Sequence, residues 1–146
     1  RPSRREGSAI LPSLRSNQID LVVVIDTSGS ISNAEMQLFV SEVDSIKGQT
    51  RSRITLQVCD NKLADEGPWE FEYWDQFALP ENLPGGGGTS FKPVFEWLAR
   101  TGKRPDLLIY FTDAQGKFPQ LEPEFNVIWL VKGKQPVPWG QRIQLN

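Results

Sequence analysis

A valine-rich apolar run over residues 20–25, DLVVVI, constrains the fold more than any other feature of this sequence. A strand that is apolar at successive positions is typical of a parallel sheet covered on both faces. The run ends at Asp26, and the following turn, DTSGSIS, places Ser28 and Ser30 at every second position after it. We therefore expect a buried strand that stops at a polar turn.

Two helices are predicted from capping residues and periodicity. Ser32, followed three residues later by Glu35, is a capping box. Apolar side chains then recur at helical spacing: Met36, Phe39, Val40, Val43 and Ile46. This helix is expected to end near Lys47 and Gly48. The second helix is predicted over residues 91–101, with Ser90 as its cap.

Further strands are predicted where apolar or alternating segments lie between turn signals. They are residues 54–59 (ITLQVC), 69–77 (WEFEYWDQF), 106–112 (DLLIYFT), 125–131 (FNVIWLV) and the short RIQL near the end. The aromatic and acidic segment 69–77 is expected at an edge of the sheet. Strands that alternate with helices predict an α/β fold: a doubly wound, mostly parallel central sheet with helices on both faces and one antiparallel edge strand.

Length and charge exclude several classes of protein. At 146 residues the chain fits one domain, which we assign to residues 19–146, and we interpret the arginine-rich residues 1–18 as a linker from a longer protein. The net charge of −2 gives no electrostatic case for binding nucleic acid or an anionic membrane. No apolar run is long enough to span a membrane, and the single cysteine, Cys59, allows no intramolecular disulfide. We therefore expect a cytoplasmic protein.

The sequence contains no histidine. This excludes a Ser-His-Asp triad, a Cys-His pair, a histidine-based zinc peptidase helix and histidine acid–base chemistry within these residues. Most hydrolase mechanisms are excluded with them, and we expect that the chain is not an enzyme.

Three polar segments are expected at the carboxyl edge of the sheet, where doubly wound folds bind ligands. Two predicted strands end in an aspartate, Asp26 and Asp113. The GGGGTS segment, residues 85–90, lies between them in sequence, at the start of the second helix. Each segment alone also fits a plain turn, a helix cap or a flexible loop. If the two strands are neighbours, however, the three segments converge on one site.

The combined pattern resembles the metal-ion-dependent adhesion site (MIDAS) of the von Willebrand factor type A (VWA) family. The matching motifs are Asp-x-Ser-x-Ser in DTSGS, Gly-Thr in GGGGTSF and strand-Thr-Asp in FTDAQG. The resemblance covers about residues 20–145. The chain is also similar to a bacterial VWA-like family whose longer members carry an N-terminal metallopeptidase-like region. The further segments that carry this similarity occur in the order AILPSL, QVCD, PVFEW, VIWLV and PWG. It departs from related domains in its fewer, shorter helices and in Ser90, where an acidic residue is expected.

The resemblance implies a Mg²⁺ (or Mn²⁺) site whose ligands in this sequence are Asp26, Ser28, Ser30, Thr89 and Asp113. Hydroxyls would bind the ion directly and the two carboxylates would hold its waters, which leaves one coordination position open. The implied function is a metal-dependent protein-binding adaptor module that captures an Asp or Glu of a partner. The implied partners are a MoxR-type AAA+ ATPase and a metallopeptidase-like domain.

Three alternatives stay open at the level of sequence. A phosphatase of the haloacid dehalogenase type would use Asp26 as its nucleophile, but it needs an acid two residues later, where this chain has Ser28. A phosphate-binding loop would need the order Gly-Lys-Ser/Thr, which GGGGTSFK lacks. The third alternative is a metal-free scaffold for a metallopeptidase-like domain, with the aromatic side chains of residues 69–74 as its contact surface.

Overall fold

The computed structural model describes residues 18–29, 31–83 and 85–145. Eight elements follow one another along the chain: β1 (Ile19–Asp26), α1 (Asn33–Gln49), β2 (Ser52–Cys59), β3 (Trp69–Phe71), α2 (Lys92–Thr101), β4 (Leu107–Thr112), β5 (Asn126–Lys132) and β6 (Gln141–Leu145). The strands form one sheet in the order β3-β2-β1-β4-β5-β6. All neighbouring pairs are parallel except β2 and β3, which are antiparallel. The predicted fold class, with one antiparallel edge strand, is therefore confirmed.

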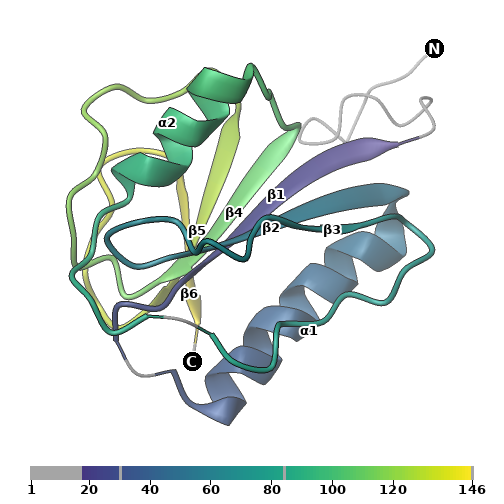
Figure 1. The fold of residues 1–146 in the computed structure, drawn as a ribbon, viewed down its shortest axis with the longest axis horizontal. Coiled ribbons are helices and arrows are strands. Elements are labelled where there is room, and N and C mark those ends of the chain that lie inside the picture. The colour runs from purple at the N-terminus through teal and green to yellow at the C-terminus, as the bar shows by residue number, and fades with distance from the viewer. Residues whose placement is uncertain (1–17, 30, 84, 146) are drawn as a thin grey trace.

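The two helices cover opposite faces of the sheet (Figure 1). β1 lies in the middle, paired with β2 on one side and β4 on the other, and its residues from Leu21 onward are buried. This placement explains why the DLVVVI run is apolar at nearly every position, because side chains on both faces of a central strand enter a core.

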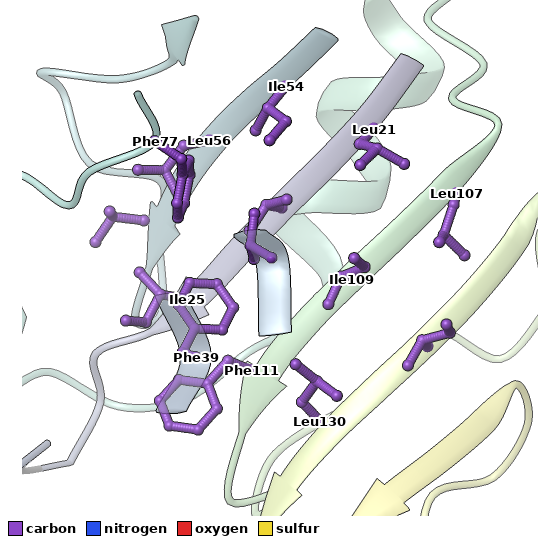
Figure 2. Close-up of a cluster of buried hydrophobic side chains, with 14 of the residues drawn as sticks. Leu21, Ile25, Phe39, Ile54, Leu56, Phe77, Leu107, Ile109, Phe111 and Leu130 are labelled. Atoms are coloured by element: carbon purple, nitrogen blue, oxygen red, sulfur yellow. The ribbon is translucent and has the colours of Figure 1, made fainter. Parts of the chain in front are cut away.

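The core on the α1 face is mainly aliphatic. Figure 2 shows side chains of β1, β2 and β4, including Leu21, Ile54 and Ile109, gathered in this cluster. α1 contributes few buried side chains, namely Phe39 and Val43, and the ring of Phe39 stacks on Phe111 with centroids 5.2 Å apart. This helix is therefore anchored by one narrow stripe, and much of its surface faces solvent.

The start of α1 is fixed by the predicted capping box. The Ser32 hydroxyl accepts a hydrogen bond from the Glu35 N–H (3.1 Å), and the Glu35 carboxylate accepts one from the Ser32 N–H (2.9 Å). This backbone hydrogen bond, helped by Lys132, lowers the pKa of Glu35 below its ordinary value. The prediction for the start of the helix is confirmed, and the helix runs to Gln49, one residue beyond the expected stop.

The core on the α2 face is mainly aromatic. Trp129 on β5 is fully buried there, with ring centroids 5.4 Å from Phe91, 5.1 Å from Tyr110 and 5.0 Å from Phe118. α2 adds Val94 and Leu98 from one side and ends at Gly102, whose positive φ of 70° suits a left-handed helix cap.

The predicted boundaries differ from the structure at several elements, and two of these differences have a clear local cause. The edge strand stops at Phe71 instead of residue 77, because the chain turns there: the Glu72 N–H donates to the Asp75 carboxylate (2.8 Å) and the Asp75 N–H donates to the Glu72 carbonyl (3.0 Å). The second helix starts at Lys92, one residue late, because Phe91 occupies the cap position without a side-chain hydrogen bond.

Two further predictions concern parts of the chain outside the sheet. Residues 1–17, which cover nearly all of the proposed linker, lie outside the described residues. In the described part of the chain, neither helix has the length and apolar character that crossing a membrane requires. The cytoplasmic location stays a prediction.

Candidate metal centre

The three predicted segments meet at the carboxyl edge of the sheet. β1 and β4 are parallel neighbours, so Asp26 at the end of β1 and Asp113 directly after β4 lie at the same edge. β1 also lies where the chain winds outward in two directions, to β2 on one side and to β4 on the other. Doubly wound folds bind ligands at this kind of switch point. The condition for convergence, that the two strands are neighbours, is therefore met.

Asp26 is held by hydrogen bonds to both of its carboxylate oxygens. The residue is 6% exposed. The Thr112 hydroxyl at the end of β4 donates to Oδ2 (2.5 Å), and the Ser28 N–H donates to Oδ1 (2.9 Å). Thr112 is oriented in turn, because its hydroxyl accepts the Ala114 N–H (3.0 Å). A carboxylate has about four acceptor positions, so these bonds fix Asp26 and leave capacity for a further ligand.

The glycine-rich segment packs directly on the Asp26 turn. The Gly86 N–H donates to the Thr27 carbonyl (3.1 Å). A Cβ atom added to Gly85 would lie 2.3 Å from the same carbonyl oxygen, which is too close for any residue other than glycine. Gly85 is therefore needed for the close approach of the two backbones.

Asp60, directly after β2, fastens the segment that carries Thr89. Its carboxylate accepts hydrogen bonds from the N–H groups of Gly87 (3.2 Å) and Lys62 (3.1 Å), and its backbone carbonyl accepts one from Ser90 (3.1 Å). Asp60 is not among the site residues predicted from the sequence. The missed signal was a third strand that ends in an aspartate, QVCD, at the same edge of the sheet.

The segment after β4 completes the contact between the three loops. A Cβ atom added to Gly116 would lie 2.5 Å from Cγ2 of Thr89, so the two backbones approach closely there as well. The Phe91 N–H also donates to the Lys117 carbonyl (3.1 Å). Asp113 is half-buried, and its carboxylate accepts the Gln115 N–H (3.0 Å). Thr89 and Asp113 thus lie on loops that contact each other.

Four of the five predicted ligands therefore lie in segments that pack together at one edge: Asp26 at the end of β1, and Ser28, Thr89 and Asp113 on the loops. Ser30 lies outside the described residues. No cluster of three or more His, Cys, Asp or Glu side chains suited to a metal is found in residues 18–29, 31–83 and 85–145. The donors gathered here are hydroxyls and two carboxylates, and this all-oxygen set fits Mg²⁺ or Mn²⁺ better than zinc.

Two side chains near the site, Thr27 and Cys59, are relevant to the kind of metal that it could bind. The Thr27 hydroxyl is buried in the turn itself and has no hydrogen-bond partner among the described residues. The Cys59 thiol is also buried, and burial raises its pKa to about 12. It therefore remains a neutral thiol near neutral pH and offers no thiolate to a softer metal.

Comparison with known proteins defines the class to which this fold and loop arrangement belong. Residues 21–146 match the family described as VWA-like domain (DUF2201), and the chain belongs to this family. An uncharacterized protein of Thermotoga maritima is 28% identical over 120 residues, which are 82% of this chain and 28% of that protein. The chain thus spans less than a third of the length of this relative.

A solved structure supports the fold. The crystal structure of the ArnB paralog VWA2 from Sulfolobus acidocaldarius superposes with a TM-score of 0.58 and 20% identity, over 80% of this chain and 35% of that chain. At this identity the likeness establishes the fold alone. The predicted VWA resemblance is confirmed at the level of the domain family, a class of domain that commonly mediates protein–protein interaction.

Proposed function

We propose that this domain is a metal-dependent protein-interaction module that captures a carboxylate of its partner. The observation that supports it best is the contact between three loops, which brings hydroxyl and carboxylate side chains to one edge of the sheet around the buried Asp26. Asp26, Ser28, Ser30, Thr89 and Asp113 would hold Mg²⁺ or Mn²⁺. When bound, the ion supplies a Lewis-acidic position to which a partner's Asp or Glu can coordinate.

The roles of the protein groups follow from their contacts. Thr112 fixes the Asp26 carboxylate from β4, and the Ser28 N–H fixes it from its own turn. Asp60 holds the backbone on both sides of Thr89 and so limits how far the Thr89 hydroxyl can move. Hydroxyl ligands are neutral, so the site keeps an attraction for an incoming carboxylate that a cage of carboxylates would lose.

The partners remain those that the sequence resemblance implies. A MoxR-type AAA+ ATPase is one, and a metallopeptidase-like domain is the other. The Thermotoga maritima relative is far longer than the region matched here, so an acidic residue of a neighbouring domain is as suitable a source of the carboxylate as a separate protein.

Magnesium or manganese is expected to stabilise the isolated domain slightly. With a dissociation constant on the order of 1 mM, about 10 mM ion would add about 1.4 kcal/mol and raise the Tm by about 3–6 °C, because the ion binds only the folded chain. The measurement is a thermal melt followed by circular dichroism, with each ion and with chelator.

The matched variant for this experiment is Thr89→Val. Valine keeps the methyl group that lies against Gly116 and replaces only the hydroxyl, with a methyl group of similar size. The variant should melt like the wild type in chelator and lose most of the shift caused by the metal. A wild-type melting curve that is the same in magnesium, manganese and chelator would contradict the proposal and favour the metal-free scaffold.

We also expect no hydrolytic activity. Asp26, the one candidate nucleophile of the phosphatase alternative, is 6% exposed and accepts hydrogen bonds on both carboxylate oxygens. Release of p-nitrophenol from p-nitrophenyl phosphate in the presence of magnesium should stay at background. Turnover that disappears in Asp26→Asn would instead identify an aspartyl-phosphate enzyme.

A further inference from the structure

A cleft of about 300 Å³ opens beside the loops of the candidate metal centre. We call it the Met36 cleft, and the described residues that line it are Thr27, Gly29, Ile31, Met36, Glu81, Leu83, Gly85 and Gly86. Three of these, Thr27, Gly85 and Gly86, belong to the contact between the Asp26 turn and the glycine-rich segment. The cleft therefore begins at the metal-site loops themselves.

One wall of the cleft is apolar and already formed. Ile31, Met36 and Leu83 are half-buried, and Ile31 and Leu83 pack on their inner sides against the aliphatic core. Ile31 precedes the cap residue Ser32 and Met36 is the fourth residue of α1, the two positions of a hydrophobic staple. Met36 is the most adaptable of the three, because its unbranched thioether fills spaces of different shapes.

The apolar surface continues along α1. Met36 also lines a shallow hollow of about 470 Å³ together with Asn33, Gln37, Val40, Ser41 and Leu79. Figure 1 shows the segment between β3 and the glycine-rich residues running beside α1 on this side of the molecule. The cleft and the hollow thus form a path that leads from the metal-site loops along the helix.

The charges along this path select the occupant. Among the described residues that line the cleft and the hollow, Glu81 is the only charged one. At the metal-site end of the path lie Asp26 and Asp113, which a bound cation would convert into a site for an anion. One carboxylate is therefore favoured at the metal, uncharged or apolar groups are favoured along the path, and a second acid beside Glu81 is disfavoured.

We propose that the partner presents an extended acidic-apolar segment: its carboxylate binds at the metal centre, and a large apolar side chain flanking that residue, such as Leu, Met or Phe, fills the Met36 cleft. The inference rests on the proposed function and adds the second half of the recognition motif. The volume agrees with this occupant, because it lies at the lower limit of the roughly 300–1,000 Å³ typical of small-molecule pockets and suits one or two side chains.

The test uses a phage-displayed peptide library with randomised positions on both sides of a fixed glutamate, and a second library with glutamine in its place. Both are selected on the 146-residue chain in magnesium and in chelator. The selected peptides should depend on magnesium and on the glutamate, carry Leu, Met or Phe beside it, and be depleted of further acids. A synthetic copy of the strongest peptide is then titrated against variants of α1.

The matched variants are Met36→Gln and Leu38→Gln, two apolar-to-amide changes on the same helix. Met36 lines the cleft, whereas Leu38 is 38% exposed and is not among the residues that line the cleft or the hollow. Met36→Gln should weaken peptide binding roughly tenfold, as loss of an apolar contact in a pocket does. Leu38→Gln should leave it unchanged, and both variants should keep the Tm shift caused by magnesium.

The outcomes separate this inference from the proposed function. Peptides that need magnesium and glutamate but show no apolar preference, or that bind Met36→Gln as tightly as the wild type, would overturn the role of the cleft and leave the metal bridge standing. Selection that is indifferent to magnesium or to the exchange of glutamate for glutamine would overturn both.

Discussion

Trp129→Ala is expected to lower the free energy of unfolding by about 3–5 kcal/mol, with a fall in Tm of roughly 10–20 °C. Trp129 is fully buried at the centre of the aromatic cluster, within 5.4 Å of three ring centroids. Its Nε1–H also donates to the Trp139 carbonyl (3.0 Å), so the alanine variant combines a large cavity with a lost hydrogen bond. Differential scanning calorimetry of wild type and variant measures the effect.

The matched control is Trp74→Ala, which removes the same side chain from the surface. Trp74 is 68% exposed and contacts Tyr73 edge to face. Its loss should change the free energy of unfolding by about 0.5 kcal/mol or less, because no cavity forms. If the two alanine variants melted at similar temperatures, the aromatic cluster would not be the main support of the α2 face.

The stability of this cluster bears on the candidate site. Phe91, which packs against Trp129, follows Thr89 and Ser90 directly and donates its N–H to Lys117 on the loop after β4. Through Phe91, the glycine-rich segment and the loop after β4 both depend on packing against the buried ring of Trp129. A cavity at Trp129 should loosen them, so the metal-induced shift in Tm is expected to shrink in Trp129→Ala as well.

The features that sequence predicted correctly depend on neighbours in the chain. The capping box at Ser32 and Glu35 spans three residues, and the apolar run of β1 reports burial on both faces without any knowledge of what covers it. The edge strand was predicted too long although its end is also set by residues close together in the chain. Alternation continues through residues 72–77, but the hydrogen bonds between Glu72 and Asp75 turn the chain away from the sheet.

The parts of the site that sequence missed depend on distant pairs. Thr112 and Asp26 are 86 residues apart, and Asp60 and Gly87 are 27 apart, so nothing local marks either pair as bonded. Thr112 was seen only as part of a strand-Thr-Asp motif whose aspartate took the metal role. Its hydrogen bond to Asp26 requires β1 and β4 to be adjacent, which the strand order decides, and paired in the register that brings Ile25 beside Phe111.

The four glycines of residues 85–88 also proved to be unequal. A Cβ atom added to Gly85 would lie 2.3 Å from the backbone oxygen of Thr27, whereas one added to Gly88 would meet its nearest neighbour, Cβ of Asn61, at 3.9 Å. Gly88 has no positive φ that would strain a side chain. Alanine reduces the freedom of the unfolded chain by a similar amount at Gly85 and at Gly88. A comparison of the two variants therefore isolates the effect of close packing.

Gly85→Ala is expected to lower the free energy of unfolding by about 1–3 kcal/mol and to abolish the metal-induced shift in Tm, because the added methyl group must push the glycine-rich segment off the Asp26 turn. Gly88→Ala should be neutral or up to about 1 kcal/mol more stable, since alanine restricts the unfolded chain, and should keep the full shift. Thermal melts of both variants in magnesium and in chelator measure the two effects together. A Gly85→Ala variant that is destabilised but retains the shift would show that the contact between these loops supports the fold without shaping the metal centre. Equal shifts and equal stabilities in the two variants would mean that the segment moves aside freely, which the hydrogen bond between Gly86 and Thr27 argues against.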